Sequence, residues 1–215
     1  MGKREGGIAQ KEKPIITDIP THPIIATEIA QYLKPHYEHL KKGVILDACA
    51  GAVTLGNAFF NELPKSFLLT YQDIKISGKS ILDFSPDEKY NIIVCNPPWH
   101  PVTLALQIWH KLYSLLADGG VMFYIINNTF CYQGAARAVN LNYQKFYFLP
   151  RFVYKSAGRP LLDCGVMVTH RASLPAQAAQ LRPFIPVSRL QEGEPWEPNE
   201  FHFLEIPDEQ KERRR

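Results

Sequence analysis

The chain has 215 residues, 46% of them hydrophobic and 21% charged, which is the composition of an ordinary globular protein with enough chain to bury a core. A net charge of +3 is too small to argue by itself for a nucleic-acid partner. No stretch reaches the length of a transmembrane helix, the N-terminus has no signal-peptide core, and the four cysteines form no C-x-x-C pair. We therefore expect a cytoplasmic protein with no membrane association, no disulfide and no metal site.

Composition divides the chain into three segments. Residues 1–20 are polar and basic, and we expect them to form a flexible arm. Residues 21–175 alternate between apolar runs and amphipathic stretches, as one folded domain does. Residues 176–215 are rich in proline and charge, and we expect this extension to pack on the domain through its aromatic residues.

The start of the domain carries a clear helix pattern followed by a clear strand pattern. We expect a helix to begin at Thr21-His22-Pro23, with Thr21 as its N-cap, and to end or bend at Pro35. Its apolar stripe consists of Ile25, Ile29, Tyr32 and Leu33. The run Gly43-Val44-Ile45-Leu46-Asp47 is short, apolar and closed by an acid, which is typical of a buried parallel strand.

Helices and strands then alternate along the chain, and this order predicts an α/β fold with a mainly parallel, doubly wound sheet. Two β-rich runs, 146–154 and 164–170, close the domain. The link between them is too short for a helical crossover, so we expect this pair to be antiparallel. The remaining elements predicted from periodicity are helices over 53–62 and 102–116 and strands over 66–71, 91–95 and 121–126.

Small and acidic residues follow the predicted strands in the first half of the domain. Asp47-Ala48-Cys49-Ala50-Gly51 forms a small-residue turn before a helix, and such a turn lets the backbone approach a ligand closely. Asp73 follows the next strand, where nucleotide-binding α/β folds place an acid that binds ribose hydroxyls. Asp83 precedes the strand over 91–95. Each acid alone is more simply explained as a solvated loop residue, but their order and their placement at strand ends together favour a nucleoside-binding sheet.

Asn96-Pro97-Pro98-Trp99 directly follows the strand over 91–95. Two successive prolines fix φ and remove two backbone donors, so the loop cannot continue a strand. The stiff turn presents an amide, exposed carbonyls and a flat ring at the edge where open α/β sheets bind ligands. It is either a strand terminator followed by a core tryptophan, or a device that grips a planar, amino-bearing group.

These motifs in this order resemble the class I S-adenosylmethionine-dependent methyltransferases that modify amino groups through an (N/D)-P-P-(Y/F/W) loop. The resemblance spans residues 21–170 and implies a seven-stranded, Rossmann-like sheet with an antiparallel last strand, and S-adenosylmethionine as cofactor. Thr21-His22-Pro23-Ile24-Ile25-Ala26 is similar to the T-P-x-x-(I/V)-A cofactor motif of DNA adenine methyltransferases. One position departs from the pattern: the first loop of this family reads D-x-x-x-G-x-G, and Val53 stands at its last glycine.

The resemblance assigns roles to individual residues. The cofactor would be held at its methionine part by the Gly51 turn, at its ribose by Asp73, and at its adenine by Asp83 with Phe84. The full cofactor set is Thr21, Pro23, Asp47, Ala48, Cys49, Gly51, Asp73, Asp83, Phe84 and Asn96. The catalytic set is Asn96, Pro97, Pro98 and Trp99, and the substrate set is Trp99, Phe152, Tyr154, Lys155 and Arg159.

The chemistry of such a loop follows from the target group. The exocyclic amine of adenine is a poor nucleophile because its lone pair is delocalised into the ring. If the Asn96 side-chain oxygen and the Pro97 carbonyl accept its two N–H groups, the lone pair can face a methyl sulfonium, so that acceptors and alignment supply most of the catalysis. Trp99 would stack on the target base, which is worth roughly 1–3 kcal/mol.

The leading hypothesis is therefore a DNA adenine-N6 methyltransferase of a bacterial or phage-infected cell. Little protein remains to read a long target sequence, so we expect short or relaxed specificity. Two alternatives stay open: methylation of a protein glutamine amide or an RNA base, which use similar loops, and a non-catalytic subunit that keeps the fold, which Val53 leaves in play. DNA is the expected partner, and the sequence leaves the oligomeric state open.

Overall fold

A computed structural model of the chain describes residues 20–127, 145–149, 164–171 and 180–182. These residues contain four α-helices and two 3-10 turns: α1 (Pro23–Leu33), η1 (Lys34–His36), α2 (Thr54–Asn61), α3 (Ile74–Ser77), η2 (Ile81–Asp83) and α4 (Val102–Leu115). They also contain seven strands: β1 (Gly43–Ala48), β2 (Phe67–Gln72), β3 (Tyr90–Cys95), β4 (Leu116–Asn127), β5 (Lys145–Leu149), β6 (Cys164–His170) and β7 (Gln180–Arg182).

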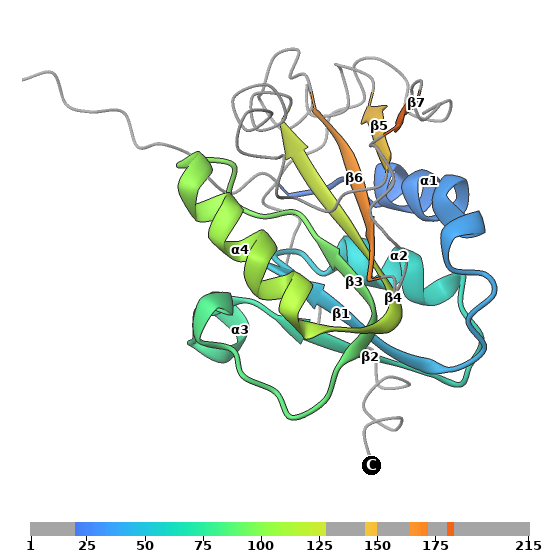
Figure 1. Cartoon of the computed structure of the whole chain (residues 1–215), viewed down its shortest axis with the longest axis horizontal. Helices are drawn as coiled ribbons and strands as arrows, with labels where there is room; N and C mark the ends of the chain where they lie inside the picture. Colours follow the sequence, from blue (N-terminus) through green and yellow to red (C-terminus); the bar gives the residue numbers. More distant parts are fainter. Residues whose placement is uncertain (1–19, 128–144, 150–163, 172–179, 183–215) are drawn as a thin grey trace, which may run out of the picture.

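The seven strands form one sheet in the order β2-β1-β3-β4-β6-β5-β7 (Figure 1). The first four of these strands are parallel to one another, and β6 is antiparallel to both β4 and β5. The predicted fold class, including the antiparallel pairing of the two closing runs, is therefore confirmed. The antiparallel strand is the sixth along the chain and not the last, because the short β7 follows it and pairs parallel with β5.

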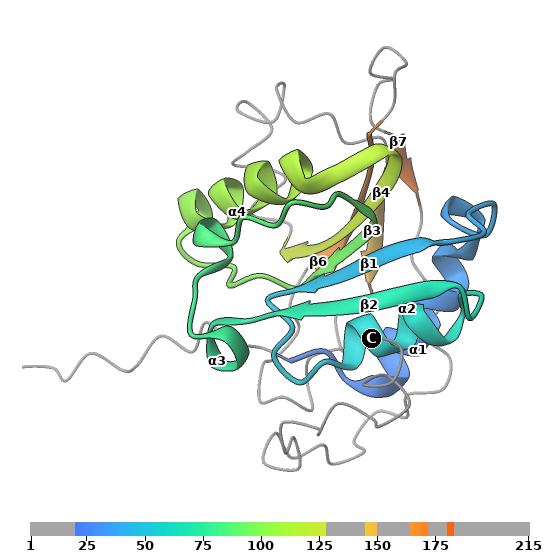
Figure 2. The same ribbon diagram turned by 90° about the horizontal axis from the view of Figure 1, so that it is seen from below.

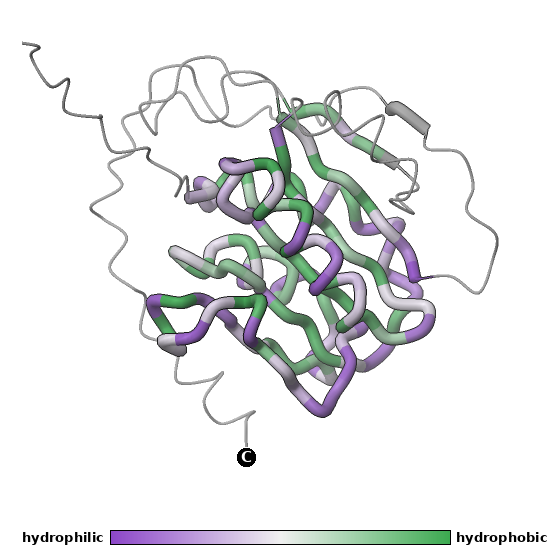
Figure 3. The backbone as a smooth tube through the Cα atoms, turned by 60° about the vertical axis from the view of Figure 1, so that its left-hand side comes forward, coloured by the Kyte–Doolittle hydropathy of each residue, from purple (hydrophilic) through white to green (hydrophobic). Residues whose placement is uncertain are grey.

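Helices cover both faces of the sheet, as a doubly wound fold requires (Figure 2). α1 and α2 pack against each other on one face, and α4 lies on the other. On the α2 face, the Phe59 and Phe123 rings meet with their centroids 4.7 Å apart. On the α4 face, the Tyr124 hydroxyl donates to the Ala105 carbonyl at 2.6 Å. Hydrophobic residues follow the strands through the interior, and hydrophilic ones gather at the connecting turns (Figure 3).

The N-cap of α1 differs from the prediction. His22 and not Thr21 is the cap: its Nδ1 accepts from the Ile24 backbone N–H at 3.1 Å. The Thr21 hydroxyl is occupied elsewhere, by the side chain of Asn96. Tyr32, expected in the apolar stripe, is 40% exposed and touches Tyr147 edge to face. The helix does end before Pro35, and η1 continues from it.

The end of α4 and the start of β4 also differ from the prediction. The helix stops at Leu115, and Leu116 already pairs with Tyr90 of β3, so residues 118–120 belong to the strand and not to a separate turn. The last turn of α4 is closed by Arg171, whose Nη1 donates to the Leu116 carbonyl at 2.7 Å. Cationic side chains at this end of a helix stabilise its unpaired carbonyls.

Several predicted features lie outside the described residues: the arm up to residue 19, the end of the run over 146–154, and most of the extension over 176–215. Of that extension, the structure describes β7 alone. No helix among the described residues is both long enough and apolar enough to span a membrane.

Candidate functional site

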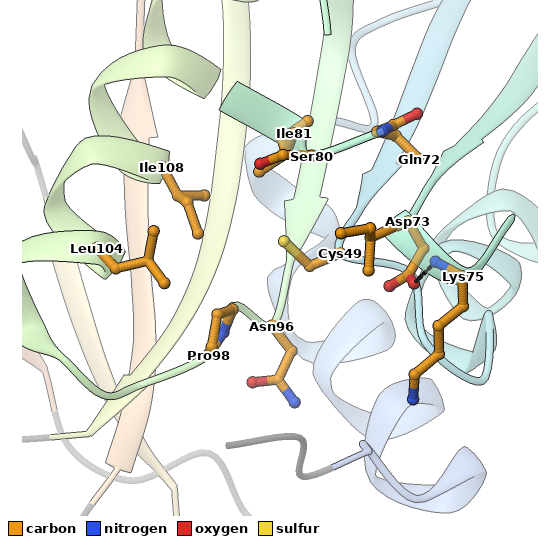
Figure 4. A pocket seen from close by; sticks show the side chains of 11 residues that line it. Cys49, Gln72, Asp73, Lys75, Ser80, Ile81, Asn96, Pro98, Leu104 and Ile108 are labelled. Atoms are coloured by element: carbon orange, nitrogen blue, oxygen red, sulfur yellow. Dashed lines mark hydrogen bonds between the residues drawn. The ribbon is translucent and has the colours of Figure 1, made fainter. Parts of the chain in front are cut away.

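A cavity of about 420 Å³ opens where the carboxyl ends of β1, β2 and β3 meet (Figure 4). Ala48 of β1 pairs with Gln72 of β2 and with Cys95 of β3, so the loops after all three strands begin at one level. Leu104 and Ile108 of α4 face Asp73 and Lys75 across the cavity (Figure 4). The lining residues are Cys49, Gln72, Asp73, Ile74, Lys75, Ser80, Ile81, Asn96, Pro98, Leu104 and Ile108.

The turn after β1 takes an unusual backbone path. Cys49, Gly51 and Val53 all have left-handed backbone angles, with φ of 56°, 46° and 55°. Glycine adopts this region freely, but a β-branched residue there is an outlier that stores about 1–3 kcal/mol of strain. Val53 thus keeps the backbone conformation that a glycine at the same position of a D-x-x-x-G-x-G loop would allow. At position 53 this chain therefore differs from the D-x-x-x-G-x-G pattern in its side chain, while its backbone takes a left-handed conformation that suits glycine.

Asp73 joins this turn to the beginning of α3. Its Oδ2 accepts from the Gly51 backbone N–H at 3.0 Å, and its Oδ1 accepts from the Lys75 backbone N–H at 2.8 Å. A carboxylate has about four acceptor positions, so these two bonds are compatible with further donors from a ligand. Asp73 therefore both fixes the turn after β1 and presents its carboxylate to the cavity.

Asp47 anchors the other side of the turn. The residue is 1% exposed, and its Oδ2 accepts from the Gly56 backbone N–H at 2.8 Å. Burial raises the pKa of the Asp47 carboxyl well above its ordinary value; the Gly56 hydrogen bond opposes this shift, and the nearby charge of Asp73 adds to it. A Cβ on Gly56 would lie 2.6 Å from the Asp47 carboxylate, so only glycine fits there without movement.

Asn96 is held by two side chains at the end of β3. The Trp99 indole N–H donates to Asn96 Oδ1, and Asn96 Nδ2 donates to the Thr21 hydroxyl, both at 3.1 Å. The Thr21 carbonyl in turn accepts from the Thr54 hydroxyl at 2.6 Å. A second, narrow pocket of about 20 Å³ lies beside this network and shares Cys49 and Asn96 with the larger cavity.

The structure brings together most of the residues predicted from the first and last motifs. The members of the predicted sets that line one of the two pockets are Thr21, Asp47, Cys49, Gly51, Asp73, Asn96 and Pro98. Pro97 is buried beside them, and Trp99 is 8% exposed and turned toward Asn96.

Four predicted cofactor residues do not line either pocket. Pro23 is exposed at the start of α1, and Ala48 is fully buried within β1. Asp83 is exposed at the end of η2, and the Phe84 ring lies against Tyr90, with the centroids 6.4 Å apart. Ser80 and Ile81, which shortly precede Asp83 and Phe84 in the sequence, do line the cavity.

Several site residues were not identified from the sequence. Ile74 directly follows the acid Asp73, and that adjacency was the available signal. Leu104 and Ile108 belong to the helix predicted over 102–116; the structure places both along the cavity, and Ile108 also belongs to the buried core. The predicted substrate residues Phe152, Tyr154, Lys155 and Arg159 lie outside the described part of the chain and stay predictions.

Comparison with known proteins finds solved structures that share this architecture. No protein-family model matches the chain, and no curated protein matches it in sequence. Among solved structures, a Listeria monocytogenes protein assigned to the class I S-adenosylmethionine-dependent methyltransferases aligns with a TM-score of 0.63 and 12% identity, over 83% of this chain and 69% of that one.

Two further structures align over comparable lengths. The methyltransferase subunit of a type I restriction-modification system from Streptococcus thermophilus gives a TM-score of 0.52 at 14% identity, over 71% of this chain but only 46% of the subunit. Magnesium protoporphyrin IX methyltransferase from Synechocystis PCC 6803, with S-adenosylmethionine bound, gives 0.52 at 12% identity, over 70% of this chain and 79% of the enzyme. At such identities the likeness is one of fold. The chain therefore has the fold of the class I S-adenosylmethionine-dependent methyltransferases.

Proposed function

We propose that this protein is an S-adenosylmethionine-dependent methyltransferase that modifies the exocyclic amine of adenine in DNA, with short or relaxed sequence specificity. The observation that carries the proposal is the position of Asn96. Asn96 lines a cavity of about 420 Å³ together with Asp73, so the residue proposed to accept the amine and the acid proposed to bind the ribose share one space. Sites for small ligands have volumes of about 300–1,000 Å³.

The lining of the cavity fits the parts of this cofactor. Asp73 offers a carboxylate to the ribose hydroxyls. Ile81, Leu104 and Ile108 offer apolar walls to a flat ring. In this assignment Ser80 and Ile81 take the adenine edge, in place of Asp83 and Phe84. Cys49 lines both pockets and Gly51 lines the smaller one, so in the same assignment this turn would hold the methionine end.

The acceptor loop would prepare the target amine. When bound, S-adenosylmethionine supplies an electrophilic methyl group. Asn96 Oδ1 and the Pro97 carbonyl accept the two N–H groups of the amine, which directs the nitrogen lone pair toward the cavity. Preorganised acceptors of this kind lower the barrier without a strong base, because they need no reorganisation during the reaction.

The choice of adenine in DNA rests on two features of the chain. An asparagine at the first position of the loop favours adenine over cytosine through the family resemblance. The segment that begins at Thr21 is similar to the cofactor motif of DNA adenine methyltransferases. The hydroxyl of Thr21 accepts a hydrogen bond from the Asn96 side chain. A base in duplex DNA must first be flipped out of the stack, at a cost of a few kcal/mol.

Methyl transfer from radiolabelled cofactor tests the proposal. The protein is incubated in parallel with unmethylated DNA, total RNA and lysate proteins, and labelled DNA is digested to nucleosides. The expected product is N6-methyladenine in DNA, and Asn96→Ala should abolish it while sparing cofactor binding. Label in RNA or protein alone would refute the DNA assignment. Cofactor binding without transfer to any acceptor would indicate a non-catalytic subunit.

A further inference from the structure

We propose that Thr21 is a positioning residue, which fixes the side-chain amide of Asn96 and couples it to the cofactor turn. The inference rests on the proposed function of the Asn96 loop and adds to it a residue that acts through Asn96. Thr21 is 3% exposed and lies just before α1, far in sequence from both motifs that it connects.

The orientation of the Asn96 amide is determined by Trp99. An indole N–H can only donate a hydrogen bond, so the Asn96 atom that faces it at 3.1 Å is the oxygen. The amide nitrogen must then point the other way, toward the Thr21 hydroxyl at 3.1 Å. An amide oxygen has two lone pairs, so the bond from Trp99 is compatible with a second donor, such as the target amine, at the same oxygen.

Thr21 supplies the second half of this arrangement. Its hydroxyl accepts from Asn96 Nδ2, while its carbonyl accepts from the hydroxyl of Thr54 at 2.6 Å. Thr54 is the first residue of α2 and directly follows Val53, the left-handed residue that ends the cofactor turn. One chain of hydrogen bonds therefore runs from the beginning of α2, through Thr21, to the amide that would accept the amine.

This arrangement predicts a specific defect when the hydroxyl is removed. In Thr21→Val the side chain keeps its shape but loses the acceptor for Asn96 Nδ2, so the amide loses one of the hydrogen bonds that position it while the bond from Trp99 remains. Misplaced acceptors slow a reaction without weakening substrate binding, by about ten- to hundredfold for small displacements. The Thr54 contact uses the backbone carbonyl of Thr21 and is retained, so the cofactor turn should stay in place.

The test compares Thr21→Val with Thr21→Ser, which returns a hydroxyl, and with Thr27→Val. Thr27 lies in α1, where its hydroxyl bonds the Pro23 carbonyl, so it controls for the same chemical change away from the site. We expect kcat to fall by about ten- to hundredfold in Thr21→Val only, with recovery in Thr21→Ser. The dissociation constant for S-adenosylhomocysteine should change less than kcat does, since the Thr21 carbonyl keeps its bond from Thr54. An unchanged kcat, or an affinity loss as large as the kcat loss, would overturn the inference.

A second measurement needs no turnover. The Trp99 indole N–H resonance, assigned through Trp99→Phe, should move in Thr21→Val and return in Thr21→Ser, because Trp99 senses the Asn96 amide directly. An indole resonance that does not move in Thr21→Val would also overturn the proposed coupling between Thr21 and the Asn96 amide. An inactive wild-type protein whose indole resonance responds as expected would refute the proposed function and leave the positioning role of Thr21 intact.

Discussion

Asp47 shows how burial and a single hydrogen bond set the behaviour of one carboxyl group. The group is 1% exposed, and burial raises its pKa well above the ordinary value, against the lowering effect of the Gly56 N–H and with an added contribution from Asp73. In the unfolded chain the same group has a pKa of about 3.9. At a pH between the unfolded and the native pKa, Asp47 is protonated in the native chain and ionised in the unfolded chain.

This difference predicts the pH dependence of stability. When the native state binds more protons than the unfolded state, the free energy of unfolding falls as pH rises. The Asp47 contribution is therefore fully present below about pH 4 and is lost as pH rises toward the raised native pKa. Asp47→Asn keeps an oxygen for Gly56 but cannot titrate, so its stability should fall less steeply from pH 4 upward. Urea unfolding at a series of pH values measures how the free energy of unfolding of each protein depends on pH. Parallel curves for the wild type and Asp47→Asn would contradict the raised pKa of Asp47.

Val53 is a second residue whose role could be only partly predicted from the sequence. The loop pattern identified the position as one that usually holds glycine, and the structure gives it the glycine-like φ of 55°. The side chain is 6% exposed, so its burial in the core offsets part of the strain of that conformation. Whether the strain of the backbone or the burial of the side chain has the larger effect on stability depends on the packing between α2 and the sheet. A local sequence pattern carries no information on that packing.

Among the elements, the close approach of α2 to the end of β1 shapes the turn that joins them. Gly56 sits in the third position of α2, and its backbone N–H bonds the Asp47 carboxylate. A Cβ at this position would lie 2.6 Å from the Asp47 side chain. The helix can therefore approach the strand end only because this residue is glycine.

Gly56→Ala should consequently reverse the usual effect of that substitution. In an ordinary helix interior the change stabilises by about 1 kcal/mol, whereas here overpacking should destabilise by about 1–3 kcal/mol. Asn61→Ala, at the exposed last residue of the same helix, should leave the free energy of unfolding almost unchanged. Thermal and urea unfolding of the two variants give the comparison, and a Gly56→Ala protein more stable than the wild type would show that α2 adjusts freely.

The ends of elements were harder to predict than their existence, for identifiable reasons. Leu116 continues the apolar periodicity of α4, but its pairing with Tyr90 draws it into β4. Thr21 is a good N-cap by residue type, but its hydroxyl bonds Asn96 and leaves the cap to the His22 ring. In both cases a contact from a distant part of the chain competes with the local preference.

At the scale of the whole molecule, the alternation of elements was sufficient to predict the sheet. Apolar runs closed by polar residues marked β1 to β4, and the short link between 146–154 and 164–170 correctly predicted the antiparallel pair. The residues that line the cavity were predicted less completely. Asp83 and Phe84 do not line the cavity, whereas Ser80 and Ile81 do. η2 contacts α4, which follows it by about twenty residues, and a local pattern does not record such a contact.

Under the proposed function, the cavity between Asp73 and α4 binds the cofactor, and calorimetry with S-adenosylhomocysteine measures that binding. We expect one binding site per chain in the wild-type protein. Removing a hydrogen bond to a charged group is worth about 1.5–3 kcal/mol, so Asp73→Ala should weaken binding by about ten- to hundredfold. Asp118→Ala, which alters a fully exposed acid on β4, should bind like the wild type. A wild-type protein that releases no heat of binding, or an Asp73→Ala variant with unchanged affinity, would contradict the assignment.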